Sequence, residues 1–175
     1  MSSAWYFAYG SNMQRATFTG RRGISFARAE PARVAGWRLV FDKPPLFPVG
    51  ESYANIVPDA AAEVLGVLYE VTPDDLAHID LTEGVLLGNY RRVEVPVTAL
   101  RRSPDAPRAA FTLTSERRDQ ALQPSVRYMG LLIAGALEHG LPSTYVDFLR
   151  SVPARPETPE AIQFRAMIDE FLRRR

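Results

Sequence analysis

The feature that most constrains the fold is an uncharged stretch near the start, residues 4–9, in which every residue is aromatic or alanine. Such a run suits a short strand that is buried on both faces. It ends at Gly10-Ser11-Asn12, where Gly10 relaxes the backbone and Asn12 is expected to cap a following helix. A strand that ends in small residues at a helix start presents neighbouring backbone N–H groups, which can bind a carboxylate or a developing oxyanion. A tight turn without a ligand is the alternative, and this stretch alone leaves both open.

Length and composition indicate a single globular domain over residues 1–175. A chain of 175 residues can bury about 70% of its unfolded surface. Its 46% hydrophobic and 23% charged residues are ordinary for a globular protein. The net charge of +1 produces no long-range field, which argues against a nucleic-acid or anionic-membrane partner. We interpret the arginine pairs as solvated surface, and Lys43, the only lysine, as a sign of codon bias toward arginine.

The residues that are missing also limit the function. There is no cysteine, which removes disulfides, thiol nucleophiles and thiolate metal sites and fits a reducing cytoplasm. The start of the chain has no basic segment followed by an apolar one, so a secretory signal is not expected. The longest apolar run, residues 129–137, is too short to span a bilayer. We therefore expect a cytoplasmic protein.

The order of the expected elements favours an α+β fold, because strands dominate the first two thirds and helices follow. Thr72 and Pro73 mark one helix start clearly, since threonine can cap and proline suits the first helical position. The pattern predicts strands at 33–35 and 37–41, then one hairpin of strands 53–57 and 64–71 around 58–62 and another of strands 90–97 and 109–114 around 101–108. It predicts a short helix at 13–18 and further helices at 73–83, at 125–139, at 142–152 and from 158 onward. The segment 42–52 is expected to be a loop and is a candidate pocket rim.

Glu83 stands out because it falls on the apolar face of the helix at 73–83. Leu76 and Ile79 define that face, and a residue seven positions after Leu76 returns to within about 20° of the same direction. Glu83 also lies at the negative end of the helix, so burial and the helix dipole both disfavour its charge. A carboxylate in such a place is a candidate general acid or base. The alternative is that the last turn frays and Glu83 reaches solvent past Gly84.

Other catalytic signatures are lacking. His78 and His139 fall on separate expected helices, where a hydrogen-bonded or solvated histidine is the simpler reading than a ligand. The sequence has no Gly-x-Ser-x-Gly elbow, no phosphate-binding loop and no His-Glu-x-x-His motif. We expect no cofactor and no metal. An enzyme with this inventory would use a carboxylate, backbone donors and hydroxyl groups.

Several segments in order resemble the gamma-glutamylcyclotransferase-like family. They are Tyr-Phe-Ala-Tyr-Gly-Ser-Asn-Met at 6–13, the strand pair at 54–57 and 64–69, Asp-Leu-Thr-Glu-Gly-Val at 80–85, Pro-Ser-Val-Arg-Tyr at 124–128 and Glu-His-Gly-Leu-Pro at 138–142. The resemblance implies a small mixed β-barrel flanked by helices. It also implies an acyltransferase- or lyase-type reaction in which a gamma-glutamyl amine attacks its own γ-carbonyl and releases 5-oxoproline.

The resemblance assigns roles to individual residues. It makes Glu83 the catalytic acid/base and gives substrate binding to Tyr9, Gly10, Ser11, Asn12, Tyr90 and Tyr128. Tyr90 and Tyr128 have an alternative as core tyrosines with satisfied hydroxyl groups. The implied partner is a small gamma-glutamyl amino acid, amine or peptide, and the protein is expected to be a monomer or homodimer. Two alternatives stay open: a non-catalytic member of the fold that binds a small carboxylate or a protein partner, and the same base acting on another acyl or amine substrate.

Overall fold

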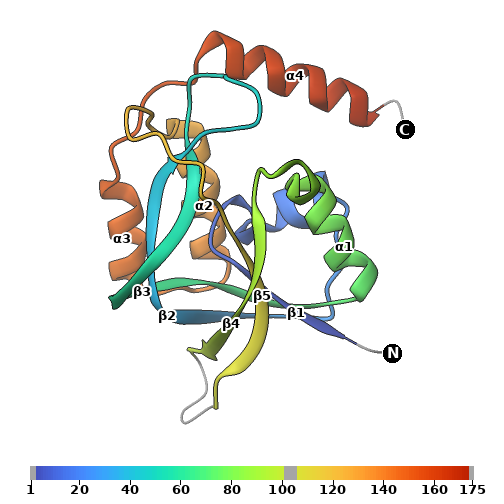
Figure 1. The fold of residues 1–175 in the computed structure, drawn as a ribbon, viewed down its shortest axis with the longest axis vertical. Coiled ribbons are helices and arrows are strands. Elements are labelled where there is room, and N and C mark those ends of the chain that lie inside the picture. The colour runs from blue at the N-terminus through green and yellow to red at the C-terminus, as the bar shows by residue number, and fades with distance from the viewer. Residues whose placement is uncertain (1–2, 101–105, 174–175) are drawn as a thin grey trace.

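The computed structural model describes residues 3–100 and 106–173, with side chains as far as residue 170. Five strands form a closed barrel in the order β1-β3-β2-β4-β5, and the helices pack outside it (Figure 1). The mixed barrel with flanking helices that the sequence predicts is therefore confirmed. The strands are β1 (Ala4–Ala8), β2 (Arg28–Lys43), β3 (Tyr53–Val71), β4 (Arg91–Ala99) and β5 (Arg108–Thr114). The helices are η1 (Ser11–Met13), η2 (Ala16–Arg21), α1 (Pro73–Thr82), η3 (Val85–Leu87), α2 (Val126–Glu138), α3 (Ser143–Ser151) and α4 (Pro159–Arg173).

The aromatic strand β1 lies at the seam of the barrel. It pairs antiparallel with β3 and parallel with β5, where Tyr6 lies opposite Phe111. Phe7 and Ala8 are buried, as expected for a strand covered on both faces. β3 approaches so closely that a Cβ atom at Gly66 would lie 2.2 Å from the carbonyl oxygen of Ala8. Glycine is therefore required there.

The hairpin predicted around 58–62 is wrong. β3 runs straight through this segment, and both of its halves pair with β2. The register shifts where Gly36, with a φ of 81°, interrupts β2 between Ala35 and Trp37. Because a bulge tolerates proline and extra residues, Pro58 lies in β3 without ending it. For the same reason the strands predicted at 33–35 and 37–41 are one strand, which reaches Lys43 and shortens the expected loop to 44–52.

The turn after β1 differs from a capped helix. A 3-10 turn, η1, is followed by a π-helical turn, η2, in place of the helix predicted at 13–18. Asn12 lies inside η1, whose N-cap is Gly10, and makes no capping bond. The prediction of Asn12 as an N-cap is thus wrong, because its amide is held by partners from elsewhere in the fold. The wide turn of η2 ends beside Arg22.

The remaining elements largely follow the sequence. α1 begins as predicted, with Thr72 Oγ1 accepting a hydrogen bond from the backbone N–H of Asp75 at 3.0 Å. It ends one residue earlier than predicted, with Glu83 as its C-cap and Gly84 at a φ of 68°. β4 and β5 form the predicted hairpin; residues 101–105 of its turn lie outside the described residues. Helices α2, α3 and α4 correspond to the three predicted ones, and none of the described helices is long and apolar enough to cross a membrane.

Candidate active site

A cavity of about 380 Å³ opens where η1, the end of α1, α2, α4 and the loop at 44–52 meet. Every residue that the sequence assigns to the site lines it: Tyr9, Gly10, Ser11, Asn12, Glu83, Tyr90 and Tyr128. The loop contributes Pro45, Leu46 and Phe47 to the wall, so the expected pocket rim is where the sequence places it. Phe164 of α4 packs against Phe47 with a ring-centroid distance of 5.3 Å. The cavity is thus built from segments that are distant in the sequence.

Glu83 projects into the cavity wall with only 13% of its side chain exposed. Its Oε1 accepts a hydrogen bond of 2.9 Å from Asn12 Nδ2 and lies 3.0 Å from Arg22 Nη1. The geometry is that of a partly buried, hydrogen-bonded carboxylate rather than of a frayed helix end. A charge-assisted pair of this kind is short and well oriented. Among the described residues both polar contacts use Oε1, which leaves Oε2 for a ligand.

Arg22 is a site residue that the sequence analysis missed. Its side chain is 20% exposed, and its guanidinium lies against Glu83, although the arginine pair to which it belongs was interpreted as solvated surface. The contact depends on the π-helical turn η2, which ends at Arg21 and directs the next residue toward α1. No local pattern distinguishes this arginine from the other paired arginines. Only the folded position of η2 does so.

The turn at Gly10–Asn12 is held in place by hydrogen bonds from a tyrosine of β3. The Tyr69 hydroxyl lies 3.2 Å from the carbonyl oxygen of Asn12 and 3.1 Å from that of Met13, and it is buried. Within the described residues, no acceptor is hydrogen-bonded to the backbone N–H groups of Gly10, Ser11 or Asn12. These donors line the cavity together. The turn can therefore bind an anionic or carbonyl oxygen, as the sequence suggests.

The tyrosines of the cavity differ in where their hydroxyl protons go. Tyr9 donates to the carbonyl oxygen of Leu113 at 2.6 Å, and Tyr90 donates to that of Ala54 at 2.8 Å. Tyr128 instead accepts a bond of 3.1 Å from the backbone N–H of Ala54, so it keeps its proton for a ligand. Burial raises the pKa of all three phenols above the ordinary value, so they stay neutral.

Lys43 is a second site residue that the sequence analysis missed. Its side chain is buried at 1% exposure, and Nζ donates to the carbonyl oxygen of Pro44 at 2.7 Å and to Asn89 Oδ1. Nζ also lies 4.4 Å from the ring centroid of Tyr90. Asn89 Nδ2 donates in turn to the backbone carbonyl oxygen of Glu83 at 2.9 Å. A short chain of contacts therefore joins the ammonium group to the catalytic candidate.

Metal-ligating side chains are not clustered in the described parts of the chain. Residues 3–100 and 106–173 hold no group of three or more His, Asp or Glu side chains that could bind a metal ion. The cavity wall offers the carboxylate of Glu83 as well as those of Glu51 and Glu157, a phenol with a free proton, three backbone N–H groups and several cations. Such a set can bind a small zwitterionic or anionic amide and move protons on it.

Known proteins resemble this chain in sequence and in fold. The model of the AIG2-like family matches residues 63–149. The gamma-glutamylcyclotransferase of Bos taurus is 30% identical over 154 residues, which cover 84% of this chain and 77% of the bovine protein. The gamma-glutamylcyclotransferase of Homo sapiens is 29% identical over 157 residues, with the same coverage of each chain. A solved structure titled gamma-glutamyl cyclotransferase shares the fold, with a TM-score of 0.77 over 99% of this chain and 100% of that chain at 23% identity. This chain therefore belongs to the gamma-glutamylcyclotransferase-like family of enzymes.

Proposed function

We propose that this protein releases 5-oxoproline from a gamma-glutamyl amide, with Glu83 as the general acid/base. The observation that carries the proposal is the partly buried carboxylate of Glu83, held on the cavity wall by Asn12 and Arg22. The names of the relatives support the reaction class. A protein that only binds small carboxylates would gain nothing from a carboxylate in its pocket, because the two negative charges repel each other.

The reaction needs no covalent intermediate with the enzyme, because the nucleophile is part of the substrate. Glu83 takes a proton from the α-ammonium, and the freed amine attacks the γ-carbonyl carbon. The new C–N bond closes a five-membered ring and places a negative charge on the carbonyl oxygen. The oxyanion then collapses, and the bond to the leaving nitrogen breaks. Two protons leave the ring nitrogen and two reach the leaving nitrogen, so Glu83 carries each in turn and ends as it began.

The other cavity groups have distinct tasks in this scheme. The α-carboxylate shares its carbon with the α-ammonium, so it must lie beside Glu83, where Arg22 and the N–H groups of the Gly10–Asn12 turn are the donors. Tyr128 retains its hydroxyl proton and donates it as a hydrogen bond to the γ-carbonyl oxygen as charge develops there. Donors fixed before the reaction stabilise such a charge strongly.

The test is 5-oxoproline release by the purified protein from a panel of gamma-glutamyl amino acids, amines and peptides. Glu83→Gln should lower kcat by about 10²–10⁴-fold, the usual contribution of a general acid/base, while 5-oxoproline still binds. Asp74→Asn is the matched control, because Asp74 lies in the exposed first turn of the same helix. Wild-type turnover by Glu83→Gln, with Asp74→Asn equally active, would remove Glu83 from this role.

A further inference from the structure

The cations of the cavity wall are unequally partnered. Four of the five form ion pairs: Arg22 with Glu83, Arg127 and Arg165 both with Glu157, and Arg21 with Asp169. Lys43 is the fifth, and among the described residues it has no carboxylate within ion-pair distance. A buried cation without a counter-charge is costly. Its place in the wall therefore needs a reason.

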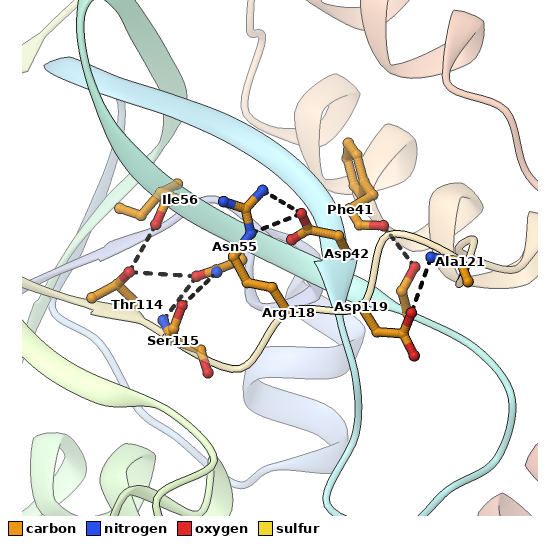
Figure 2. Close-up of polar contacts among 10 residues, drawn as sticks. Phe41, Asp42, Asn55, Ile56, Thr114, Ser115, Arg118, Asp119 and Ala121 are labelled. Carbon is orange, nitrogen blue, oxygen red and sulfur yellow. Dashed lines mark hydrogen bonds and ion pairs between the residues drawn. The ribbon is translucent and has the colours of Figure 1, made fainter.

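The acidic neighbour of Lys43 in the sequence faces another cation. Asp42 forms its ion pair with Arg118, and Figure 2 shows the two side chains meeting beside Asn55 and Ser115, which tie β3 to the segment after β5. Adjacent residues of a strand point to opposite faces. Lys43 lines the cavity, whereas Asp42 is not among the lining residues.

The contacts that Lys43 does make leave it able to hold a ligand. Its two hydrogen-bond acceptors are the neutral oxygens of Pro44 and Asn89, and an ammonium group has three N–H donors. Arg117 Nη1 also donates to Asn89 Oδ1, at 3.2 Å, so two positive charges meet at one amide oxygen. Burial, the charge of Arg117 and the opposing charge of Glu83 together leave the pKa of Lys43 lowered to about 8. An anion bound at this position would relieve the repulsion.

The position of Lys43 indicates which anionic group of the substrate would bind there. Asn89 links the ammonium to the backbone of Glu83, so Lys43 lies next to the reacting centre. In the proposed reaction the α-ammonium and α-carboxylate both stay with Glu83, Arg22 and the Gly10–Asn12 turn. The leaving nitrogen departs from the γ-carbon, and an amino-acid leaving group carries its carboxylate two bonds further on. That carboxylate is the second negative charge of the substrate.

We propose that Lys43 binds the carboxylate of the leaving amino acid and so selects gamma-glutamyl amino acids over neutral gamma-glutamyl amines and amides. This assignment rests on the proposed function and names the substrate class of the same site. Lys43 is then a specificity-determining residue. Its ammonium group pairs with the carboxylate of the substrate, which explains why Lys43 has no ion-pair partner among the described residues of the wall.

The experiment measures kcat/KM for gamma-glutamyl-alanine and gamma-glutamyl-alaninamide, which differ in the charged carboxylate. The measured quantity is the ratio of the two values, acid over amide. Lys43→Met should lower this ratio about 10–100-fold, the range for a lost hydrogen bond between charged groups. Lys43→Arg should restore most of it. Arg165→Met, which removes a cation already paired with Glu157, is the matched control and should keep the ratio within about 3-fold of wild type.

The pH dependence gives a second reading that a structural role would not produce. The acid-over-amide ratio of the wild type should fall above about pH 8, as the ammonium loses its proton. The charged and titratable groups around it are Glu83 at the end of α1, Arg117 after β5 and Tyr90 before β4. Because Glu83 and the substrate amine affect both substrates equally, they cancel in the ratio. Lys43→Arg should show no such fall, since arginine stays charged.

Each outcome decides a different claim. If the wild type releases no 5-oxoproline from either substrate, the proposed function is overturned and this inference with it. If the wild type acts on both substrates and Lys43→Met changes them by the same factor, only the inference is overturned. A ratio that falls in Lys43→Met, recovers in Lys43→Arg and holds in Arg165→Met supports it.

Discussion

At the scale of the residue, Asn12 links the turn after β1 to the catalytic candidate. Its Nδ2 donates both to the Tyr6 hydroxyl at 3.1 Å and to Glu83 Oε1 at 2.9 Å. The two bonds fix the orientation of the amide, and thereby the carboxylate. Asn12 therefore acts as a positioning residue for Glu83 as well as part of the N–H array. An asparagine that served only as a helix N-cap would not make these two contacts.

The hydroxyl of Tyr128 should matter more for turnover than that of Tyr9. Tyr128→Phe removes a phenol whose proton is free for the substrate, whereas Tyr9→Phe removes one that donates to Leu113. We expect Tyr128→Phe to lower kcat by about 10–1,000-fold, as for the loss of an oxyanion donor. Tyr9→Phe should instead lower the free energy of unfolding by about 1 kcal/mol. Steady-state kinetics and urea unfolding of both variants check this, and equal kinetic losses would contradict it.

Which site residues the sequence can reveal depends on how local their signal is. Glu83 can be identified from the sequence because its spacing of seven residues from Leu76 places it on the apolar face of one helix. Arg22 and Lys43 are not visible, because η2 and the end of β2 bring them to their partners Glu83 and Asn89, which are distant in the sequence. A lone lysine and one arginine among several pairs carry no local mark. Their roles exist only in the folded chain.

At the scale of the element, predictions succeeded where a boundary has its own chemistry. Thr72 and Pro73 start α1, and Ser125 caps α2 by accepting from the backbone N–H of Tyr128 at 3.2 Å. The failure at 58–62 has the opposite cause. Pro58 looks like a turn, but β2 offers a continuous partner strand and a glycine bulge that absorbs it. Pairing with a distant strand overrides the local preference.

Helix α2 packs closely against the turn after β1 at one glycine, Gly135. A Cβ atom at Gly135 would lie 2.6 Å from Gln14 N and from Met13 C, which are backbone atoms of the turn, whereas one at Gly130 would meet nothing within 4 Å. We expect Gly135→Ala to lower the free energy of unfolding by about 1–3 kcal/mol through overpacking, and to lower activity by displacing the turn. Gly130→Ala, in the same helix, should raise stability by up to about 1 kcal/mol.

Thermal or urea unfolding of the two glycine variants, with kinetics on each, checks this pair. If both alanine substitutions raise stability, or if Gly135→Ala retains full activity, the close contact between α2 and the turn does not position the site.

At the scale of the whole molecule, the closed barrel buries several tyrosines, some in the cavity wall and others in the core beside it. Burial raises the pKa of Tyr6, Tyr9, Tyr69, Tyr90, Tyr128 and Tyr145. A group whose folded pKa is raised contributes stability that is present below its unfolded pKa and lost as the pH rises. Stability should therefore fall above about pH 10, the ordinary tyrosine value.

Tyr145 isolates one part of this alkaline loss. Its hydroxyl is buried without a hydrogen-bond partner among the described residues, and it lies outside the cavity wall. Tyr145→Phe should raise the free energy of unfolding by about 1 kcal/mol near neutral pH. It should also flatten the loss above pH 10 by about 1.4 kcal/mol per pH unit. The pKa of Lys43 is lowered from 10.5 to about 8, so its titration makes stability rise between these two pH values. This contribution is the same in the wild type and in Tyr145→Phe.

Urea unfolding of the wild type and Tyr145→Phe from pH 7 to pH 11 gives the difference directly, because the contribution of Lys43 cancels. Parallel curves for the two proteins would show that Tyr145 does not stay protonated in the fold.

The central claim is that the amine of the substrate, and not water, attacks the γ-carbonyl carbon in the cavity beside Glu83. The most direct measurement is the reaction of the purified protein with gamma-glutamyl-alanine in oxygen-18-labelled water, followed by mass spectrometry of the products. Cyclisation predicts 5-oxoproline and alanine in equal amounts with no label in the ring product, and Glu83→Gln should form both products far more slowly. Glutamate that carries the label would mean that water is the nucleophile, and would contradict the account.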